Sequence, residues 1–317
     1  MGNQLSTRKK YQQEKSSSKS FSSQTDSSHV STICQPKLPI EYIFPLNDAE
    51  VTRLHGQHYL FKHLFQGNYF APIEPILKND SKVLDVGCGP HAIWLIDMAI
   101  DFPECQFYGF DVAEPICLNE VEKLHKPDNC FIERADVFDG FSYEPNTFDF
   151  VHQRLMYNVY PHDKIPWMLQ EMLRVTKPNG WIELVEPDLN PKRAGPLFTT
   201  LMKAGAYIQL LRLLGKPFQG KDLVNHMVEA GLREIKSDYG SLPCCWGGYI
   251  GKLMYEDLLI VFQHYGPHIH EYLDPGSEFD REKYETMIDT AFDECAEYQT
   301  FINIRWAYGK KVVSSAA

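Results

Sequence analysis

The chain has 317 residues, of which 44% are hydrophobic and 23% charged, with a formal net charge of −11. These values are typical of a soluble globular protein and exclude a collagen-like, fully disordered or disulfide-stapled small protein. The acidic charge disfavours nucleic acid as a partner, because contacts to phosphates need lysine and arginine. No run of apolar residues is long enough to predict a membrane-spanning helix, and the N-terminal region lacks the apolar segment of a secretory signal. We therefore expect a cytoplasmic protein whose eight cysteines are free thiols.

The first 35 residues differ from the rest of the chain. They contain ten serines and five basic residues against two acidic ones. Such a segment buries too little apolar surface to offset the entropy of ordering, so we expect residues 1–35 to be a disordered tail and residues 36–317 to form one domain. Its start, Met-Gly-Asn-Gln-Leu-Ser, fits the N-myristoylation pattern with Gly2 as acceptor. Arg8, Lys9 and Lys10 would supply the second signal for peripheral membrane contact; the alternative is a solvated tail without a lipid.

The first half of the body alternates helical and strand patterns. A helix capped by Asn47 or Asp48 is predicted to run to about Gln66. Short apolar runs then predict strands at 82–86, 106–110, 130–134, 148–152 and 181–186. Helices are predicted between them at 92–101, 115–125 and 163–175, and a turn at 177–180. This alternation favours a doubly wound α/β fold with a mostly parallel sheet.

The second half is richer in helix. Apolar spacing predicts helices at 196–214, 220–230, 248–264 and 281–297, with a polar loop through Pro267 and Pro275. Strands at 232–239 and 299–307 bring the sheet to seven strands. We expect residues 190–270 to form a helical cover on the side where a substrate enters.

The segment from Val83 to Pro90 carries the clearest chemical signal. An apolar strand ends in Asp85, and Gly87, Cys88 and Gly89 lead into a helix. Glycines let the backbone approach a ligand closely, and a helix N-terminus offers unpaired N–H groups to an anion. Pro90 suits the first position of the following helix.

Two further acids follow strands of the same sheet. Asp111 closes the second strand, where a carboxylate can accept two hydrogen bonds from a ribose diol. Asp136 follows the third strand, at an edge where an adenine amino group can be met. Val112 and Val137, which follow these acids, complete the candidate cofactor site. The alternative for each acid is that it only caps the helix after it.

The order and spacing of these residues resemble class I S-adenosylmethionine-dependent methyltransferases. Asp85 to Gly89 are similar to the cofactor loop of that family, Asp111 to its ribose acid and Asp136 to its adenine-side acid. Within it, segments such as His152-Gln153-Arg154-Leu155-Met156 resemble a fungal branch, the methyltransferase regulators of secondary metabolism. The resemblance implies a Rossmann-like fold, S-adenosyl-L-methionine as cofactor and methyl transfer by in-line displacement.

One residue departs from the family pattern. His91 stands where the family usually has a third glycine. A histidine disfavours positive φ, so we expect it to weaken cofactor binding. The alternative function is therefore a catalytically weak relative that acts through protein partners. The same segment, taken as Gly87-x-Gly89-x-x-Ala92, also fits a dinucleotide fingerprint, which the acid before the loop disfavours.

Candidates for acceptor chemistry lie at the ends of the fourth and fifth strands: His152, Arg154, Tyr157 and Glu186. His152 either lines the cofactor, acts as a base or is structural; Tyr157 is expected in the pocket wall. Glu186 either positions an acceptor cation or has a capping or solvated role. No metal is expected, since the histidines at 264–270 lack a second ligand group. The acceptor, whether small molecule, lipid-like molecule or protein, is not identified by the sequence.

Overall fold

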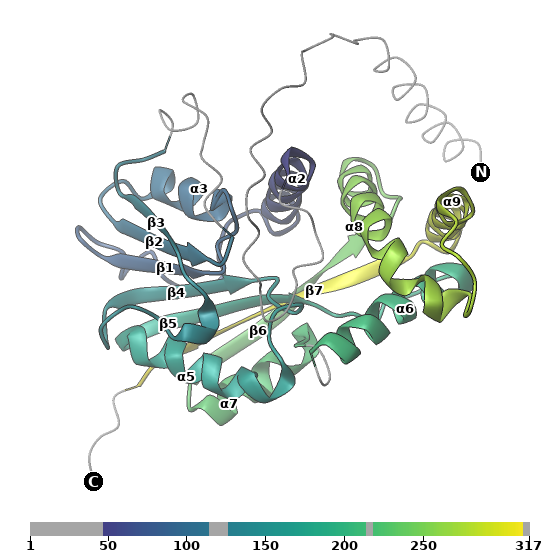
Figure 1. Ribbon diagram of the computed structural model, residues 1–317. Coiled ribbons are helices and arrows are strands. Elements are labelled where there is room, and N and C mark those ends of the chain that lie inside the picture. Colours follow the sequence, from purple (N-terminus) through teal and green to yellow (C-terminus); the bar gives the residue numbers. More distant parts are fainter. Residues whose placement is uncertain (1–46, 114–125, 214–217, 313–317) are drawn as a thin grey trace, which may run out of the picture. The chain divides into compact units, whose positions relative to one another are not determined.

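The computed structural model describes residues 47–113, 126–213 and 218–312, all within the unit Ile40–Ala317 (Figure 1). The predicted helix at 115–125, the tail and its acylation site at Gly2 lie outside these residues. None of the helices within the described ranges is long and apolar enough to cross a membrane.

Seven strands form one sheet in the order β3-β2-β1-β4-β5-β7-β6. Their bounds are β1 Lys82–Val86, β2 Gln106–Asp111, β3 Cys130–Arg134, β4 Phe148–Arg154, β5 Thr176–Pro187, β6 Arg233–Pro243 and β7 Phe301–Lys310. The first five strands are parallel, and β7 is antiparallel to both neighbours. The predicted mostly parallel seven-stranded sheet is therefore confirmed. The strand order reverses between β1 and β4, the switch point where ligands bind in open α/β sheets.

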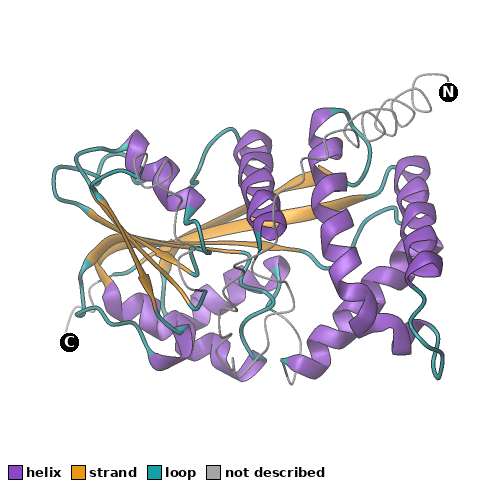
Figure 2. Ribbon diagram, turned by 45° about the horizontal axis from the view of Figure 1, so that its top comes forward, coloured by secondary structure: helices purple, strands orange, loops and turns teal. Residues whose placement is uncertain are grey.

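Helices cover both faces of this sheet (Figures 1 and 2). Their bounds are α2 Asp48–Phe65, α3 Ile93–Asp101, α5 Ile165–Val175, α6 Pro196–Arg212, α7 Leu223–Ala230, α8 Tyr249–Leu273 and α9 Arg281–Tyr298. Local capping explains several ends. The Asn47 side chain accepts a hydrogen bond from the Glu50 N–H (3.0 Å), and Gly231, with φ +97°, ends α7.

Alternating side chains on β1 show how the core is divided. Leu84 and Val86 pack in a cluster with α5 and α7, whereas Val83 packs on the other face with Trp94 and Leu95 of α3. All five are at most 2% exposed. A third cluster joins α2, α6, α8 and α9 to the far ends of β5, β6 and β7. These three clusters fix the loops at the carboxyl edge of the sheet.

One prediction about the second half is wrong. The predicted loop through Pro267 is helical, because α8 continues to Leu273. Here α9 supports the helix: the Tyr284 hydroxyl donates to the Phe262 carbonyl (2.9 Å), and the Tyr284 ring packs against Gly266. The predicted turn at 177–180 falls within the bounds of β5, where pairing with β4 passes from Thr176 directly to Trp181 and Asn179 has φ +67°. Residues 190–270 contain helices together with β6, the strand predicted at 232–239.

Candidate functional site

The glycine loop after β1 is shaped by two left-handed residues, Gly87 (φ +70°) and Gly89 (φ +74°). A Cβ at Gly87 would collide with the Met156 thioether, whereas a Cβ at Gly89 would meet nothing within 4 Å. The Gly87 and Cys88 N–H groups both donate to the Phe110 carbonyl, at 3.0 and 3.1 Å. The loop is therefore held to β2 through its backbone, with open space beside Gly89.

Asp111, the last residue of β2, completes this attachment. Its two carboxylate oxygens accept hydrogen bonds from the Gly89 N–H (2.9 Å) and the Ala113 N–H (2.8 Å). Burial raises the pKa of Asp111; backbone hydrogen bonds from Ala113, Gly89 and Val112 oppose the rise, and Asp85 adds to it. A carboxylate has about four lone-pair positions, so acceptor capacity remains beside these donors. That capacity matches a vicinal diol.

Asp136 lies at the same edge of the sheet. The N–H of its neighbour Ala135 donates to the Asp111 carbonyl at 3.0 Å. One oxygen of Asp136 accepts the Phe138 N–H (2.9 Å) and caps the short 3-10 helix Val137–Asp139, in which Val137 is buried. The capping alternative is thus observed for this acid. It occupies one carboxylate oxygen.

Asp85 and His152 face each other across the switch point, and their side chains bind one another. Asp85 Oδ1 lies 2.9 Å from His152 Nδ1, and both residues are buried. Burial lowers the pKa of His152 despite the hydrogen bond to Asp85, so the ring is neutral and donates from Nδ1. Trp94 stacks on the ring at 3.8 Å, tilted by 6°. This arrangement corresponds to the structural alternative for His152.

Glu186 anchors the loop that follows β4. Its carboxylate accepts the backbone N–H groups of Met156 (2.8 Å) and Tyr157 (3.2 Å), and it is fully buried. Burial raises the pKa of Glu186 well above its usual value. Leu155, just before the anchored pair, has a strained φ of +59°. Glu186 therefore holds the backbone of a turn and is neither a helix cap nor solvated, and the same loop places Met156 against Gly87.

Sequence reasoning missed a polar group that joins α2 to α3. Asp97 Oδ2 is contacted by His58 (3.0 Å), Lys62 (2.6 Å) and Asn68 (3.0 Å). Arg154 reaches the other ring nitrogen of His58 at 3.3 Å, and burial lowers the pKa of Arg154 to about 10. The sequence carried a signal for this polar group, because His58 and Lys62 are four residues apart and therefore share one face of the predicted helix.

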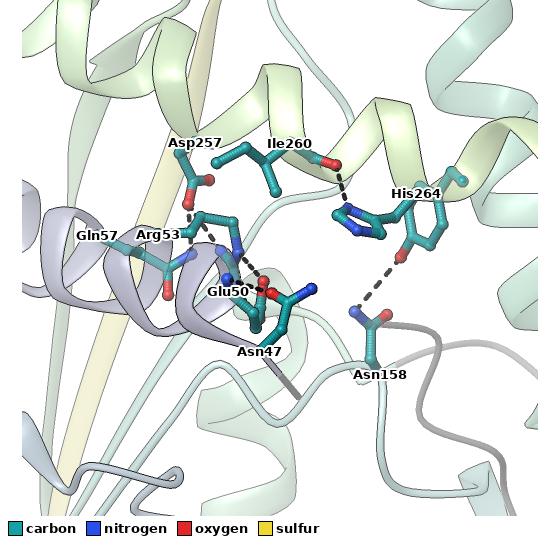
Figure 3. Close-up of polar contacts among 9 residues, drawn as sticks. Asn47, Glu50, Arg53, Gln57, Asn158, Asp257, Ile260 and His264 are labelled. Carbon is teal, nitrogen blue, oxygen red and sulfur yellow. Dashed lines mark hydrogen bonds and ion pairs between the residues drawn. The ribbon is translucent and has the colours of Figure 1, made fainter. Parts of the chain in front are cut away.

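Tyr157 lies between the loop and the helical layer. Burial raises the pKa of Tyr157 well above its usual value, with a further rise from Tyr265 and a fall caused by Arg53. Arg53 of α2 binds Glu50 and, at 2.7 Å, Asp257 of α8 (Figure 3). Tyr157 thus lies between the loop, α2 and α8, and its role in a pocket wall stays a prediction.

The prediction that His91 disturbs the loop because it must take a positive φ is wrong. The positive φ falls on Ala92 (+44°), which precedes α3, while His91 is buried with its ring edge-on to His55 of α2 (5.2 Å). The helix begins at Ile93, so Pro90 lies before it rather than at its first position. His264, His268 and His270 lie on α8. Within the part of the chain that the structure describes, no group of metal-ligating side chains is suited to hold an ion.

Comparisons with known proteins agree with this geometry. A profile of the family described as "Methyltransferase domain" matches residues 57–237, more than half of the chain. The N-methyltransferase verN of Clonostachys rogersoniana is 33% identical over 157 residues, which are 49% of this chain and 53% of that protein. The secondary metabolism regulator laeA of Aspergillus niger is 26% identical over 212 residues, 64% of this chain and 52% of that protein. The chain thus spans about half the length of these curated relatives.

Among solved structures, a putative sarcosine dimethylglycine methyltransferase from Galdieria sulphuraria aligns with a TM-score of 0.48 and 15% identity, covering 82% of this chain and 86% of that one. The fungal resemblance expected from the sequence is confirmed by the matches to verN and laeA. With residues 57–237 matched and the sheet order in place, the chain belongs to the methyltransferase domain family, whose cofactor is S-adenosylmethionine.

Proposed function

We propose that this protein transfers a methyl group from S-adenosylmethionine to a small-molecule acceptor. The observation that carries the proposal is Asp111, which holds the glycine loop through Gly89 and keeps acceptor capacity for a ribose diol. The relative named N-methyltransferase verN supports methyl transfer, and the small-molecule class of the acceptor is part of the proposal.

The residues present fit this cofactor better than a dinucleotide. The N–H groups of Gly87, Cys88 and Gly89 all donate inside the protein, so they offer no cradle to a pyrophosphate. Two carboxylates, Asp85 and Asp111, lie at the loop, where negative charge favours a cationic ligand. In the proposed complex Asp111 holds the ribose, Asp136 faces the adenine side, and the backbone at Gly87 and Gly89 permits close approach.

When bound, the cofactor supplies an electrophilic methyl group on a sulfonium. The protein then has to align the acceptor and exclude water. Glu186 contributes indirectly to aligning the acceptor, because it fixes the loop that carries Met156 and Tyr157 at the end of β4. His152 is committed to Asp85 through Nδ1 and serves the same positioning purpose. A general base is needed only for an acceptor that stays protonated until attack.

The alternative of a catalytically weak partner-binding protein rested on His91. The geometry of His91 lends that alternative no support, since Ala92 carries the positive φ and the ring turns to His55. The cytoplasmic location stays a prediction, as do the acylation of Gly2 and contact of the tail with membranes, which fall on residues outside the described ranges.

The test is methyl transfer itself. Purified protein is incubated with methyl-labelled S-adenosylmethionine and a fungal small-molecule extract, and formation of S-adenosylhomocysteine and of labelled products is followed by mass spectrometry. We expect labelled small molecules with the native protein and with Asp238→Ala, an exposed acid on β6, and none with Asp111→Ala. Formation of S-adenosylhomocysteine without any labelled small molecule would contradict the small-molecule acceptor, and absence of S-adenosylhomocysteine would contradict the activity.

A further inference from the structure

Arg154, the last residue of β4, has no anion in direct contact within the described part of the chain. Its Nη2 group donates to His58 Nδ1 (3.3 Å), and its guanidinium lies over the Phe61 ring, 5.3 Å from the ring centre. Both partners belong to α2. Neither compensates the charge, because burial lowers the pKa of His58 and its ring is neutral at pH 7.

This arginine differs from the other arginines that are buried or half-buried. Three further arginine side chains of the described ranges have that degree of burial, and each of them contacts a carboxylate. The pairs are Arg53 with Glu50 and Asp257, Arg174 with Glu171, and Arg305 with Asp188. Arg154 is therefore a half-buried cation that the fold leaves without an ion pair in these ranges.

The carboxylates that act on Arg154 from a distance are already engaged. Asp85 and Glu183 both favour the charged form of Arg154 electrostatically, but neither forms an ion pair with it. Asp85 binds His152, and Glu183 accepts two backbone N–H groups. An anion that came into contact with Arg154 would supply the compensating charge that these residues do not.

The Arg154 guanidinium also keeps a complete pair of donors. An arginine has five N–H donors, and two edges of its fork can each bind both oxygens of a carboxylate. His58 takes one hydrogen of Nη2, so the edge that does not use this hydrogen stays free. Nε and Nη1 donate to no described residue, and neither is among the fully buried atoms that lack a partner. These donors are therefore accessible from solvent.

The orientation of the guanidinium is fixed by a chain of hydrogen bonds. Asp97 of α3 accepts from His58 Nε2 (3.0 Å), which leaves Nδ1 of the same ring as the acceptor for Arg154. Three elements thus hold the side chain before a ligand arrives. A donor edge that is already oriented loses less conformational entropy on binding.

Arg154 lies on the side of the glycine loop opposite to the groups proposed for the adenosine. β1 lies between β2 and β4 in the sheet. Asp111 and Asp136 follow β2 and β3, whereas Arg154 ends β4 and directly precedes the loop that Glu186 fixes. This position is where the acceptor has to be aligned in the proposed function.

We propose that Arg154 binds a carboxylate of the methyl acceptor through the free edge of its guanidinium, so that the acceptor is a carboxylate-bearing small molecule. A carboxylate presents two oxygens to two parallel N–H donors and carries the missing negative charge. A neutral amide of the same shape offers one oxygen and no charge. The inference rests on the proposed function, because it names the class of acceptor for the same site.

The experiment compares carboxylates with matched amides. Binding of acetate, benzoate and phenylacetate is measured against acetamide, benzamide and phenylacetamide by saturation-transfer NMR, with the full-length protein saturated by S-adenosylhomocysteine. Arg154→Met keeps an apolar stem over Phe61, Arg154→Lys keeps the charge, and Arg281→Met removes an exposed arginine of α9 as the control. S-adenosylhomocysteine and its decarboxylated analogue are also titrated into each protein by calorimetry.

We expect at least one carboxylate to bind about tenfold more tightly than its amide in native protein and Arg281→Met. The preference should disappear in Arg154→Met. It should shrink in Arg154→Lys, because lysine has the charge without the two-donor edge. The affinity of both Arg154 variants for S-adenosylhomocysteine should equal that of native protein.

Three results would overturn the inference. The first is equal binding of carboxylates and amides by native protein. The second is a preference that persists in Arg154→Met or is undiminished in Arg154→Lys. The third is an Arg154→Met variant that loses affinity for S-adenosylhomocysteine but not for the decarboxylated analogue, since Arg154 would then hold the carboxylate of the cofactor. Failure of native protein to bind S-adenosylhomocysteine would instead contradict the proposed function.

Discussion

Two buried glutamates of β5, Glu183 and Glu186, accept hydrogen bonds from backbone N–H groups. Glu183 of β5 accepts the Phe70 and Ala71 N–H groups through one oxygen (2.7 and 2.6 Å), while its second oxygen, Oε1, is buried without a partner. Burial raises the pKa of Glu183 to about 7, although the two donors and Arg154 oppose the rise. The folded protein therefore keeps a proton there that the unfolded chain releases near pH 4.5.

This proton predicts the pH dependence of one variant. Between pH 4.5 and about 7 the folded state binds more protons at Glu183, so the stability that this residue contributes falls as pH rises. Glu183→Gln keeps an oxygen for the two N–H groups but does not titrate. Relative to native protein, the free energy of unfolding of Glu183→Gln should rise by on the order of 3 kcal/mol between pH 5 and pH 8, as measured by urea unfolding. The exposed control Glu278→Gln should show no such gain, and a pH-independent difference for Glu183→Gln would refute the assignment.

At the level of residues, the sequence located the acids better than it identified their partners. Asp85, Asp111 and Asp136 were expected at strand ends and are found there. The pairing of Asp85 with His152 could not be derived, because it joins residues 67 positions apart through strand register. A carboxylate that caps a backbone and one that binds a ligand also look alike in a sequence.

Among the elements, the strands were the most predictable. β1 and β3 begin and end at the predicted residues, because apolar runs bounded by polar turns are a local signal. The error at α8 has a tertiary cause. Gly266 and Pro267 predict a break locally, but α9 supports the helix through Tyr284. Contacts of this kind override local propensity and do not appear in the local pattern.

The packing of α9 on α8 predicts opposite effects for two glycine substitutions. A Cβ at Gly266 would lie 2.6 Å from the Tyr284 ring, whereas one at Gly56 in the middle of α2 would meet nothing within 4 Å. We expect Gly266→Ala to lower the free energy of unfolding by about 1–3 kcal/mol through overpacking. Gly56→Ala should raise the free energy of unfolding by roughly 0.5–1 kcal/mol, because alanine reduces the conformational entropy of the unfolded chain. Thermal unfolding of both variants measures this, and a stabilised Gly266→Ala would contradict the described packing.

On the scale of the whole molecule, topology brings the candidate site together. The switch between β1 and β4 places the glycine loop, Asp111 and the Glu186-anchored loop at one edge. The alternation of strands and helices was enough to predict this edge. The α2–α8 wall with Arg53 and Asp257 was not predictable, because its ion pair joins residues 204 positions apart in sequence.

Cofactor binding by the native protein requires Asp111 if this edge of the sheet is the methyl-donor site. Calorimetric titration of the native protein with S-adenosylmethionine and S-adenosylhomocysteine should give micromolar dissociation constants, corresponding to about −8 kcal/mol. Asp111→Ala should weaken both by about 100-fold, because charge-assisted hydrogen bonds to the ribose are lost, while Asp238→Ala should bind as the native protein does. A folded native protein that binds neither compound, or an Asp111→Ala variant with native affinity, would contradict the assignment of this edge as the methyl-donor site.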